Sequence, residues 1–339
     1  MRIRWIVSGT NVERSSPDLL SDLASYRYRA AIPLQALRER GHTCDWYALS
    51  PGEAIDDAHP ALRDADALVV AKNHTEPHEV IALLERAHER AVATVVDVCD
   101  DYFSRPHDLT PYYRALVERA GTVTASSLRL AAAIEDATDR EAHLVRDPYE
   151  GPAGTPRWSP AASGVRALWF GTPLNLPALL EAAMTLPQRR DFRLEIVALT
   201  RRCEGLEAAF AKMSGPDLRL TFQEWTLGGN WAALDACDLV LIPVKSDEFS
   251  AAKGPNRVVE ALRAGRYAVT GALAAYDEFK PFAAVGGDLA AGIAWGLDNR
   301  AAVLERIAAG QAYVAAHHSP QSVAAEWEAV LREVSRRGP

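Results

Sequence analysis

The chain has 339 residues, of which 48% are hydrophobic and 24% are charged, and its formal net charge is −8. This length predicts two domains of roughly 100–200 residues each, and the composition is that of a folded globular protein, which excludes a disordered chain. The acidic charge and the lack of long Lys/Arg runs exclude an extended nucleic-acid surface, so any bound phosphate would be held by a few placed cations.

Strand-like and helix-like segments alternate through the first half of the chain. A helix is predicted over residues 28–40 and ends at Gly41, and a second is predicted over 76–90, with Pro77 in the first turn, where proline is tolerated. Strands are predicted at residues 2–8, 43–49, 67–71, 93–96, 122–125 and 143–145. This alternation favours a parallel sheet that is covered on both faces.

A linker is predicted at residues 147–160, where four prolines and two glycines occur in 14 residues and break any regular element. The alternation then resumes. Strands are predicted at 165–170, 193–198, 218–222, 239–242 and 267–270, helices at 177–186, 204–213, 230–236 and 255–264, and two or three closing helices from 288 to 337. The fold class is therefore α/β, with two Rossmann-like, doubly wound parallel-sheet domains that face each other across a cleft, where ligands would bind.

Cysteine usage and hydropathy bear on the compartment. The four cysteines are Cys44, Cys99, Cys203 and Cys237. They are far apart in the sequence and show no C-x-x-C spacing, so we expect reduced thiols rather than disulfides or a zinc site. The N-terminus has no signal-like apolar run, and no stretch approaches the ~20 apolar residues of a membrane-spanning helix. We expect a cytoplasmic protein without an integral membrane segment, and the sequence leaves peripheral membrane contact open.

Residues 238–265 are the most informative segment, because a buried strand, a polar loop and a helix follow one another there. Lys253 and Arg257 place two cations where the helix begins, and this end of a helix already favours an anion. Cations at this end cost stability unless an anion binds, so the segment predicts a phosphate site. Glu260, on the same helical face as Arg257, could accept hydrogen bonds from a ribose diol. The alternative is a surface pair of Arg257 and Glu260 beside a solvated Lys253.

This segment resembles the donor-binding motif of GT-B glycosyltransferases. The matching residues are Lys253, Asn256, Arg257, Glu260, Ala261, Leu262 and Gly265. The resemblance implies that Lys253, Asn256 and Arg257 hold the diphosphate of a nucleotide sugar and that Glu260 holds its ribose. Many retaining members have a glutamate eight positions before the ribose glutamate. Ala252 stands there in this chain, so the stereochemistry stays open.

Three further segments fit the resemblance. Residues 167–173 look like the strand and turn that open the family's C-terminal domain, which implies that Gly171 and Thr172 approach the diphosphate. Arg201 and Arg202 end a strand where the family often binds phosphate, although both could simply be solvated. Trp225 falls in the nucleobase-contacting loop, where it could stack on the base or pack between the domains.

The first half supplies the acceptor-side candidates. Residues 25–29 resemble the family's first loop and helix. The resemblance implies that Tyr26, Arg27 and Arg29 face donor phosphate or an acceptor. The alternative is that these side chains are simply solvated. Asp97, Asp100 and Asp101 follow a buried strand. Asp100 or Asp101, with a pKa raised by like-charged neighbours, could be the general base, or these carboxylates could cap a helix and pair with an arginine.

His74, just past another strand, is an equal candidate for the base, with a surface histidine as its alternative. The chain lacks the G-x-G-x-x-G, P-loop, G-x-S-x-G and HExxH motifs, which argues against common dehydrogenases, nucleotidases and hydrolases. His317 and His318 lack a third ligand at helical spacing, so no metal site is expected.

The resemblance implies an N-terminal acceptor-side domain of residues 1–150 and a donor domain of residues 160–315, with the last helix, 320–337, packing on the first. It implies metal-independent transfer of a sugar from a UDP- or GDP-type sugar to an acceptor hydroxyl or amine on a small molecule, glycan or lipid. No cofactor is expected, since the nucleotide sugar is a co-substrate. Two alternatives remain: an epimerase-like enzyme on the same fold, and an inactive protein that binds a nucleotide sugar.

Overall fold

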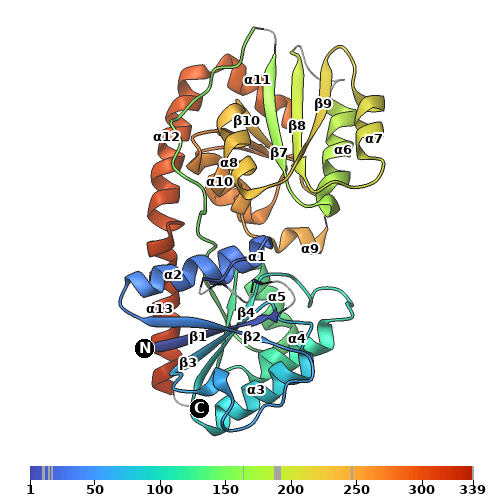
Figure 1. The fold of residues 1–339 in the computed structure, drawn as a ribbon. Coiled ribbons are helices and arrows are strands. Elements are labelled where there is room, and N and C mark those ends of the chain that lie inside the picture. Colours follow the sequence, from blue (N-terminus) through green and yellow to red (C-terminus); the bar gives the residue numbers. More distant parts are fainter. Residues whose placement is uncertain are drawn as a thin grey trace. The chain divides into compact units, whose positions relative to one another are not determined.

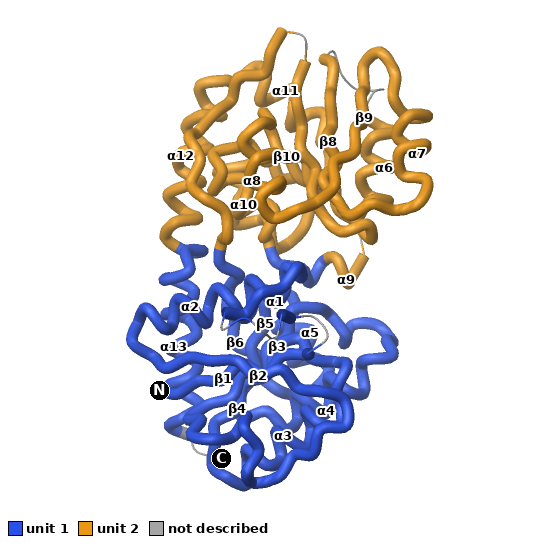
Figure 2. The backbone as a smooth tube through the Cα atoms, viewed as in Figure 1, with its two compact units in different colours: residues 1–148, 251–254, 317–339 blue, residues 149–250, 255–316 orange. Residues whose placement is uncertain are grey.

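The computed structural model describes residues 1–9, 12–13, 16, 18–162, 164–186, 192–245 and 247–337. The chain divides into two compact units (Figure 2). Unit 1 comprises Met1–Pro148, Ala251–Gly254 and His317–Pro339, and unit 2 comprises Tyr149–Ser250 and Pro255–Ala316. Four residues from a loop of the second half, 251–254, thus belong to the first unit.

Unit 1 contains a six-stranded parallel sheet with the order β2-β1-β3-β4-β5-β6 (Figure 1). Its strands are β1 (Arg2–Ser8), β2 (Thr43–Leu49), β3 (Ala67–Ala71), β4 (Ala93–Val98), β5 (Thr122–Ala125) and β6 (Ala142–Leu144). Successive residues enter different cores, since Leu68 and Val70 belong to one apolar cluster and Ala67 and Val69 to another. A sheet that is buried on both faces requires such uninterrupted apolar strands.

The helices of unit 1 cover these two faces. They are α1 (Ala24–Tyr26), the π-helical η2 (Arg27–Ala31), α2 (Ile32–Glu39), the short η3 (Pro60–Leu62), α3 (Pro77–Glu89), α4 (Thr110–Arg119), α5 (Leu128–Thr138) and α13 (Pro320–Arg337). Helices α3, α4 and α5 pack in one core, and α2 and α13 in the other. Trp327 of α13 meets Trp5 of β1 edge to face, with ring centroids 5.6 Å apart. The last helix therefore packs as part of unit 1.

Unit 2 has a second six-stranded parallel sheet, in the order β12-β11-β10-β7-β8-β9. Its strands are β7 (Val165–Phe170), β8 (Leu194–Thr200), β9 (Leu218–Glu224), β10 (Leu239–Ile242), β11 (Tyr267–Thr270) and β12 (Ala284–Val285). Its helices are η4 (Pro173–Asn175), α6 (Leu176–Thr185), α7 (Leu206–Met213), α8 (Leu227–Ala236), α9 (Glu248–Ala251), α10 (Asn256–Arg263), η6 (Ala274–Phe279), α11 (Leu289–Asp298) and α12 (Arg300–His317). Figure 1 shows α6 and α7 on one side of this sheet and α8 and α10 on the other.

Both sheets are doubly wound, which confirms the predicted fold class. In unit 1 the strand order reverses between β1 and β3, and in unit 2 it reverses between β7 and β10. In doubly wound sheets, ligands bind where loops leave the carboxyl ends of the strands at this switch point. The topology therefore directs attention to the loops after β1 and β3, and to those after β7 and β10.

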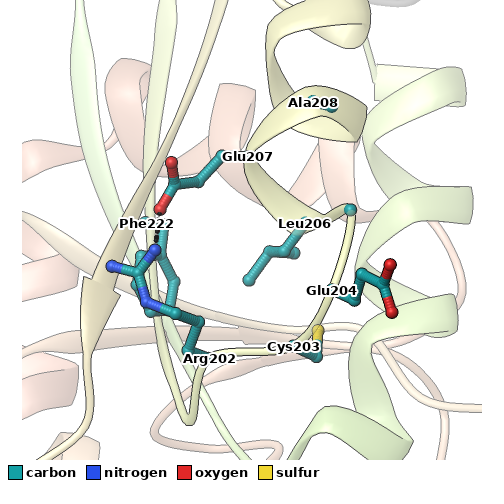
Figure 3. A pocket seen from close by; sticks show the side chains of 8 residues that line it. Arg202, Cys203, Glu204, Leu206, Glu207, Ala208 and Phe222 are labelled. Carbon is teal, nitrogen blue, oxygen red and sulfur yellow. Dashed lines mark hydrogen bonds and ion pairs between the residues drawn. The ribbon is translucent and has the colours of Figure 1, made fainter.

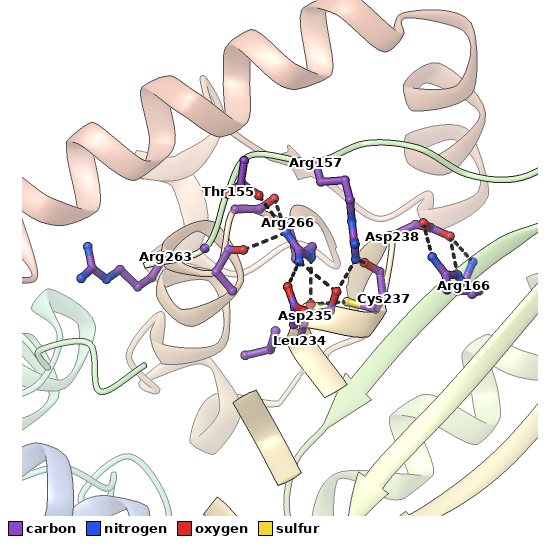
Figure 4. Close-up of polar contacts among 12 residues, drawn as sticks. Thr155, Arg157, Arg166, Leu234, Asp235, Cys237, Asp238, Arg263 and Arg266 are labelled. Carbon is purple, nitrogen blue, oxygen red and sulfur yellow. Dashed lines mark hydrogen bonds and ion pairs between the residues drawn. The ribbon is translucent and has the colours of Figure 1, made fainter. Parts of the chain in front are cut away.

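A buried arginine holds the end of α10 and part of the predicted linker within unit 2 (Figure 4). Arg266 is 1% exposed, and its guanidinium donates hydrogen bonds to the carbonyl oxygens of Leu234, Asp235, Thr155 and Ala264. These carbonyls come from the end of α8, the linker and the end of α10. The network therefore fixes the C-terminal end of the helix whose N-terminus carries the predicted phosphate site.

The structure bears on two expectations from the sequence, the state of the cysteines and the membrane-spanning helices. All four cysteines are free thiols, and burial raises the pKa of Cys44 and of Cys237 to about 12. Over the described residues, no helix combines the length and the apolar composition that crossing a bilayer requires.

Candidate functional site

Helix α10 is the first helix of unit 2 after α9 and connects β10, a strand at the switch point of unit 2, to β11. Its first two residues, Asn256 and Arg257, are half-buried. Asn256 Oδ1 and Arg257 Nη1 are enclosed, and neither has a hydrogen-bond partner among the described residues. A buried guanidinium N–H without an acceptor costs free energy, and the partial positive charge of the helix end adds to that cost. An anion placed here would remove both penalties.

Glu260, one turn further along α10, is a buried acceptor. It is 1% exposed, and its carboxylate accepts hydrogen bonds from the backbone N–H groups of Glu150 at 2.7 Å and Gly151 at 3.1 Å. The alternative of a surface pair between Arg257 and Glu260 is therefore wrong. The carboxylate ties α10 to the start of the predicted linker, and its contact with a ribose stays a prediction.

The turn after β7 lies on the other side of this switch point. Gly171 is half-exposed, and a Cβ there would lie 3.3 Å from the ring of Trp169. Thr172 is exposed and starts the short helix η4. Two buried polar atoms lack hydrogen-bond partners in the described part of the chain: Nε1 of Trp169 on β7, and Oγ1 of Thr200 at the end of the neighbouring strand β8. Unsatisfied polar atoms thus gather at the carboxyl edge of β7 and β8 as well.

A pocket of about 480 Å³ opens beyond β8 (Figure 3). Its lining residues are Arg202, Cys203, Glu204, Gly205, Leu206, Glu207, Ala208 and Phe222. The Arg202 guanidinium lies 5.0 Å from the centroid of the Phe222 ring and pairs with Glu207 and Glu224. Arg202 therefore already has carboxylate partners, while Phe222, which the sequence did not single out, offers an aromatic surface.

The other two predicted donor residues of unit 2 lie at the same edge. Arg201 is exposed, directly after β8. Trp225 is half-buried, and its backbone N–H bonds to the carbonyl oxygen of Thr200 at 2.9 Å. Their predicted phosphate and nucleobase contacts remain predictions.

In unit 1, one carboxylate holds two lysines. Asp100, just past β4, accepts a hydrogen bond from Lys72 Nζ at 2.6 Å and pairs with Lys253 Nζ as well. Burial would raise the pKa of Asp100, but the charges of Lys253 and Lys72 outweigh burial and lower it below its ordinary value. The expected raised pKa is therefore wrong, and Asp100 is a stable carboxylate that binds protons weakly.

Lys253 is positioned by the segment 251–254. Ala252 is 2% exposed within the core of unit 1, and the Ser127 hydroxyl donates to its carbonyl oxygen at 2.6 Å. These contacts anchor the peptide that carries Lys253 beside Asp100. The phosphate-binding role of Lys253 remains a prediction, and the structure adds Asp100 as its partner.

The remaining acidic candidates have structural partners. Asp101 accepts hydrogen bonds from the backbone N–H groups of Phe103 at 2.9 Å and Ser104 at 3.0 Å, so it closes the turn after β4. Asp97 does not follow the strand but lies within β4, where it is buried against Arg29. The alternative interpretation, in which one carboxylate pairs with an arginine and another caps the next helix, is therefore right for Asp97 and wrong for Asp101, because α4 has no side-chain cap.

The structure also corrects the expectation for residues 25–29, which form helix rather than a ligand-facing loop. Arg29 is 1% exposed and is bound by Asp97 and Asp147. Arg27 is 8% exposed and donates to the carbonyl oxygen of Asp22 at 2.8 Å. The Tyr26 hydroxyl accepts from the backbone N–H of Ser8 and donates to the carbonyl oxygen of Lys72. All three side chains are buried because this helical turn packs onto the sheet.

His74 is half-exposed and follows β3 at the switch point of unit 1. Burial and the charge of Lys72 lower the pKa of its imidazole, so it is neutral near pH 7. Its Nδ1 is buried without a partner among the described residues, and the same holds for both side-chain polar atoms of Asn73. Sequence reasoning did not single out Asn73, whose one local signal is its place beside His74 in the loop after β3. In the described part of the chain, no group of three or more His, Cys, Asp and Glu side chains could hold a metal ion.

Comparisons with known proteins extend this picture. No protein-family model and no curated protein matches the sequence. HepE from Anabaena, solved in complex with UDP, superposes with a TM-score of 0.69 at 13% identity, covering 98% of this chain and 100% of HepE. AviGT4, a glycosyltransferase involved in avilamycin A biosynthesis, gives 0.62 at 16% identity, with 99% of each chain covered.

TarM from S. aureus, solved with UDP, gives a TM-score of 0.60 at 10% identity over 79% of this chain. The match spans only 56% of TarM. At these identities the likeness shows the fold, and it confirms the predicted resemblance at that level. The chain has the fold of GT-B glycosyltransferases.

Proposed function

We propose that this protein is a glycosyltransferase that moves a sugar from a nucleoside diphosphate sugar to a hydroxyl or amine of an acceptor. One observation carries the proposal: the enclosed Nη1 of Arg257 has no hydrogen-bond partner among the described residues, and it lies at a helix N-terminus at a topological switch point. A diphosphate supplies the negative oxygens that this arrangement lacks.

The same groups would assist the chemistry. As the bond to the sugar breaks, negative charge grows on the leaving diphosphate, and preorganised donors stabilise that charge without reorganising. Arg257 and the first N–H groups of α10 would do this, with Gly171 and Thr172 approaching from the turn after β7. The predicted roles of Lys253 as a phosphate ligand and of Glu260 as a ribose ligand belong to this proposal.

UDP is the nucleotide that we favour. HepE and TarM were solved with UDP, and the pocket beside Phe222 and Arg202 offers an aromatic ring and a guanidinium on which a base can stack. Because cationic side chains and helix N–H groups would neutralise the diphosphate, we expect no metal requirement. Transfer that persists in excess EDTA would agree with this, and transfer that EDTA abolishes and Mg²⁺ restores would refute it.

A second candidate is an inactive protein that binds a nucleotide sugar. It is favoured by the bonds of Asp100 and Asp101, since both proposed base carboxylates already serve structural partners. His74 is the candidate base that the structure leaves neutral and half-exposed. Binding of a nucleotide sugar without turnover on any acceptor would favour this second candidate.

A thermal-shift screen against UDP-, GDP- and dTDP-sugars tests the proposal directly. A ligand that binds only the folded state at 100 times its Kd stabilises that state by about 2.7 kcal/mol. For a unit of 150–250 residues this corresponds to a rise in Tm of roughly 5–10 °C. We expect such a rise with UDP-sugars, followed by transfer of radiolabelled sugar. A midpoint that no nucleotide sugar moves would refute the proposal.

A further inference from the structure

The C-terminal end of α10 meets a buried cation that is bound mainly by backbone (Figure 4). Each of the three nitrogens of the Arg266 guanidinium donates to a carbonyl oxygen, and the acceptors are Leu234 at 2.8 Å, Asp235 at 2.9 Å, Thr155 at 3.0 Å, Ala264 at 2.9 Å and Gly265 at 3.1 Å. The Asp235 carboxylate, which also pairs with Arg266, is 82% exposed. The partially negative ends of α8 and α10 therefore supply much of the compensation that a buried guanidinium requires.

The segment 150–157 holds the same helix along its side. The backbone N–H of Gly154 donates to the carbonyl oxygen of Arg263 at 3.0 Å, in the last turn of α10. The two backbones approach so closely that a Cβ on Gly154 would overlap the carbonyl group of Ala264. At mid-helix, the Glu260 carboxylate accepts two backbone N–H groups from the start of this segment. Helix α10 is thus fixed at its middle and at its C-terminal end.

The other end of α10 carries the proposed phosphate ligands. Pro255 precedes the helix and forms no side-chain cap, and Arg257 Nη1 is enclosed without a partner among the described residues. A helix of eight residues spans about 12 Å and is too short to bend, so a shift at its C-terminal end moves the donors at its N-terminus by a comparable distance. Misplacing a catalytic group by about 1 Å can cost about 100-fold in rate.

We propose that Arg266 is a positioning residue for the diphosphate of the donor. It acts through α10, by setting where the Arg257 guanidinium and the first N–H groups of the helix lie. This inference rests on the proposed function and adds to it a residue at the far end of the helix from the ligand. The planar fork of arginine reaches carbonyls on three segments at once, which the compact ammonium of lysine cannot do.

The test compares two substitutions of one residue by isothermal titration with UDP. Arg266→Lys keeps the charge but loses the fork, and Arg266→Met loses both. At a temperature where calorimetry shows each variant to be folded, the Kd for UDP should rise about tenfold in Arg266→Met and by a smaller factor in Arg266→Lys. The stoichiometry should stay unchanged. A purely structural role predicts the opposite, because a partly unfolded sample binds with the original Kd at fewer sites per chain.

Arg166→Met is the matched control. Arg166, on β7, pairs at 3.1 Å with the fully buried Asp238, which directly precedes β10. Losing this partner leaves a buried carboxylate and should also destabilise unit 2, but the pair joins two strands and none of its hydrogen bonds reaches α10. The variant should unfold at a lower temperature and bind UDP with the Kd of the unmodified protein.

Hydrogen exchange supplies a readout that needs no ligand. The amides of residues 256–263 should exchange faster in Arg266→Met than in Arg166→Met, and Arg266→Lys replaces Arg266→Met in both measurements if the latter does not fold. The inference is overturned if the folded Arg266 variants keep the original Kd for UDP, or if α10 exchanges equally in the Arg266 and Arg166 variants. Absence of UDP binding to the unmodified protein would refute the donor proposal instead, so the two failures are distinguishable.

Discussion

Replacing Arg29 by Met should destabilise unit 1 strongly. Arg29 binds Asp97 through Nε at 3.0 Å and Nη2 at 2.5 Å, and it binds Asp147 through Nη1 at 2.9 Å. All three side chains are at most 8% exposed. Burial would lower the pKa of Arg29, but Asp97 and Asp147 raise it above its ordinary value, so the guanidinium stays charged. The substitution would leave two buried carboxylates without their cation.

Removing one partner of a buried ion pair costs about 3–5 kcal/mol. At roughly 2–4 °C per kcal/mol for a unit of this size, the unfolding transition of unit 1 should fall by roughly 6–20 °C. Differential scanning calorimetry measures this change. Arg2→Met is the control, because Arg2 is 55% exposed beside Asp64 and Asp66, and loss of such surface pairs costs at most about 1 kcal/mol.

Equal destabilisation by the two substitutions would refute the structural role of Arg29. UDP affinity provides a second readout. If Arg29 were a phosphate ligand, as residues 25–29 suggested from the sequence, Arg29→Met would weaken UDP binding at temperatures where the variant is folded. The buried network predicts unchanged UDP affinity there.

Three other predictions follow from single contacts. A hydrogen bond from Arg40 is the largest effect on the Glu328 carboxylate, and although burial opposes it, the pKa of Glu328 falls to about 2. Because this value lies below that of the unfolded chain, the ionised carboxylate stabilises the fold above about pH 4.5, and this stabilisation is lost as the pH falls toward 2. Unfolding measured against pH should lose this dependence in Glu328→Gln. Gly265 has a φ of 71°, and a Cβ there would lie 2.5 Å from a carbonyl oxygen, whereas Gly41 has a φ of 90° and open space around it. Gly265→Ala should therefore lower the free energy of unfolding more than Gly41→Ala does. Equal losses in the two variants would exclude the clash. Phe222→Ala should weaken UDP binding by about 1–3 kcal/mol if the base stacks there, and Gly41→Ala should leave that affinity unchanged.

The strands were the most predictable part of the fold. Those at 67–71, 122–125, 165–170 and 267–270 were predicted with the bounds that the structure shows. Each is a short run rich in β-branched, aromatic or small residues, which favour strands, so local sequence indicates both ends. Helices α4 and α5 were not predicted. Helix α4 mixes aromatic and charged residues, which weakens its apolar pattern, whereas α5 buries Leu130, Ala133 and Ile134 at helical spacing.

Side-chain partners were far less predictable, because they join residues that are distant in sequence. Asp97 lies 68 positions from Arg29, and Lys253 lies 153 positions from Asp100. Nothing local distinguishes a buried arginine in such a network from a solvated arginine in a loop. The position of α10 after β10, by contrast, followed from local pattern, and this is why the candidate phosphate site could be named from the sequence.

Isothermal titration with UDP tests the central claim most directly. Arg257→Gln removes the charge at the start of α10, and Arg263→Gln removes one at its other end, where Arg263 lies over the ring of Tyr149 at 4.1 Å. Losing a charge-assisted hydrogen bond should weaken UDP binding by about 1.5–3 kcal/mol, or roughly tenfold to 150-fold. We predict this loss for Arg257→Gln and near-unchanged affinity for Arg263→Gln. Absence of UDP binding in the unmodified protein, or equal affinities in the two variants, would contradict the account.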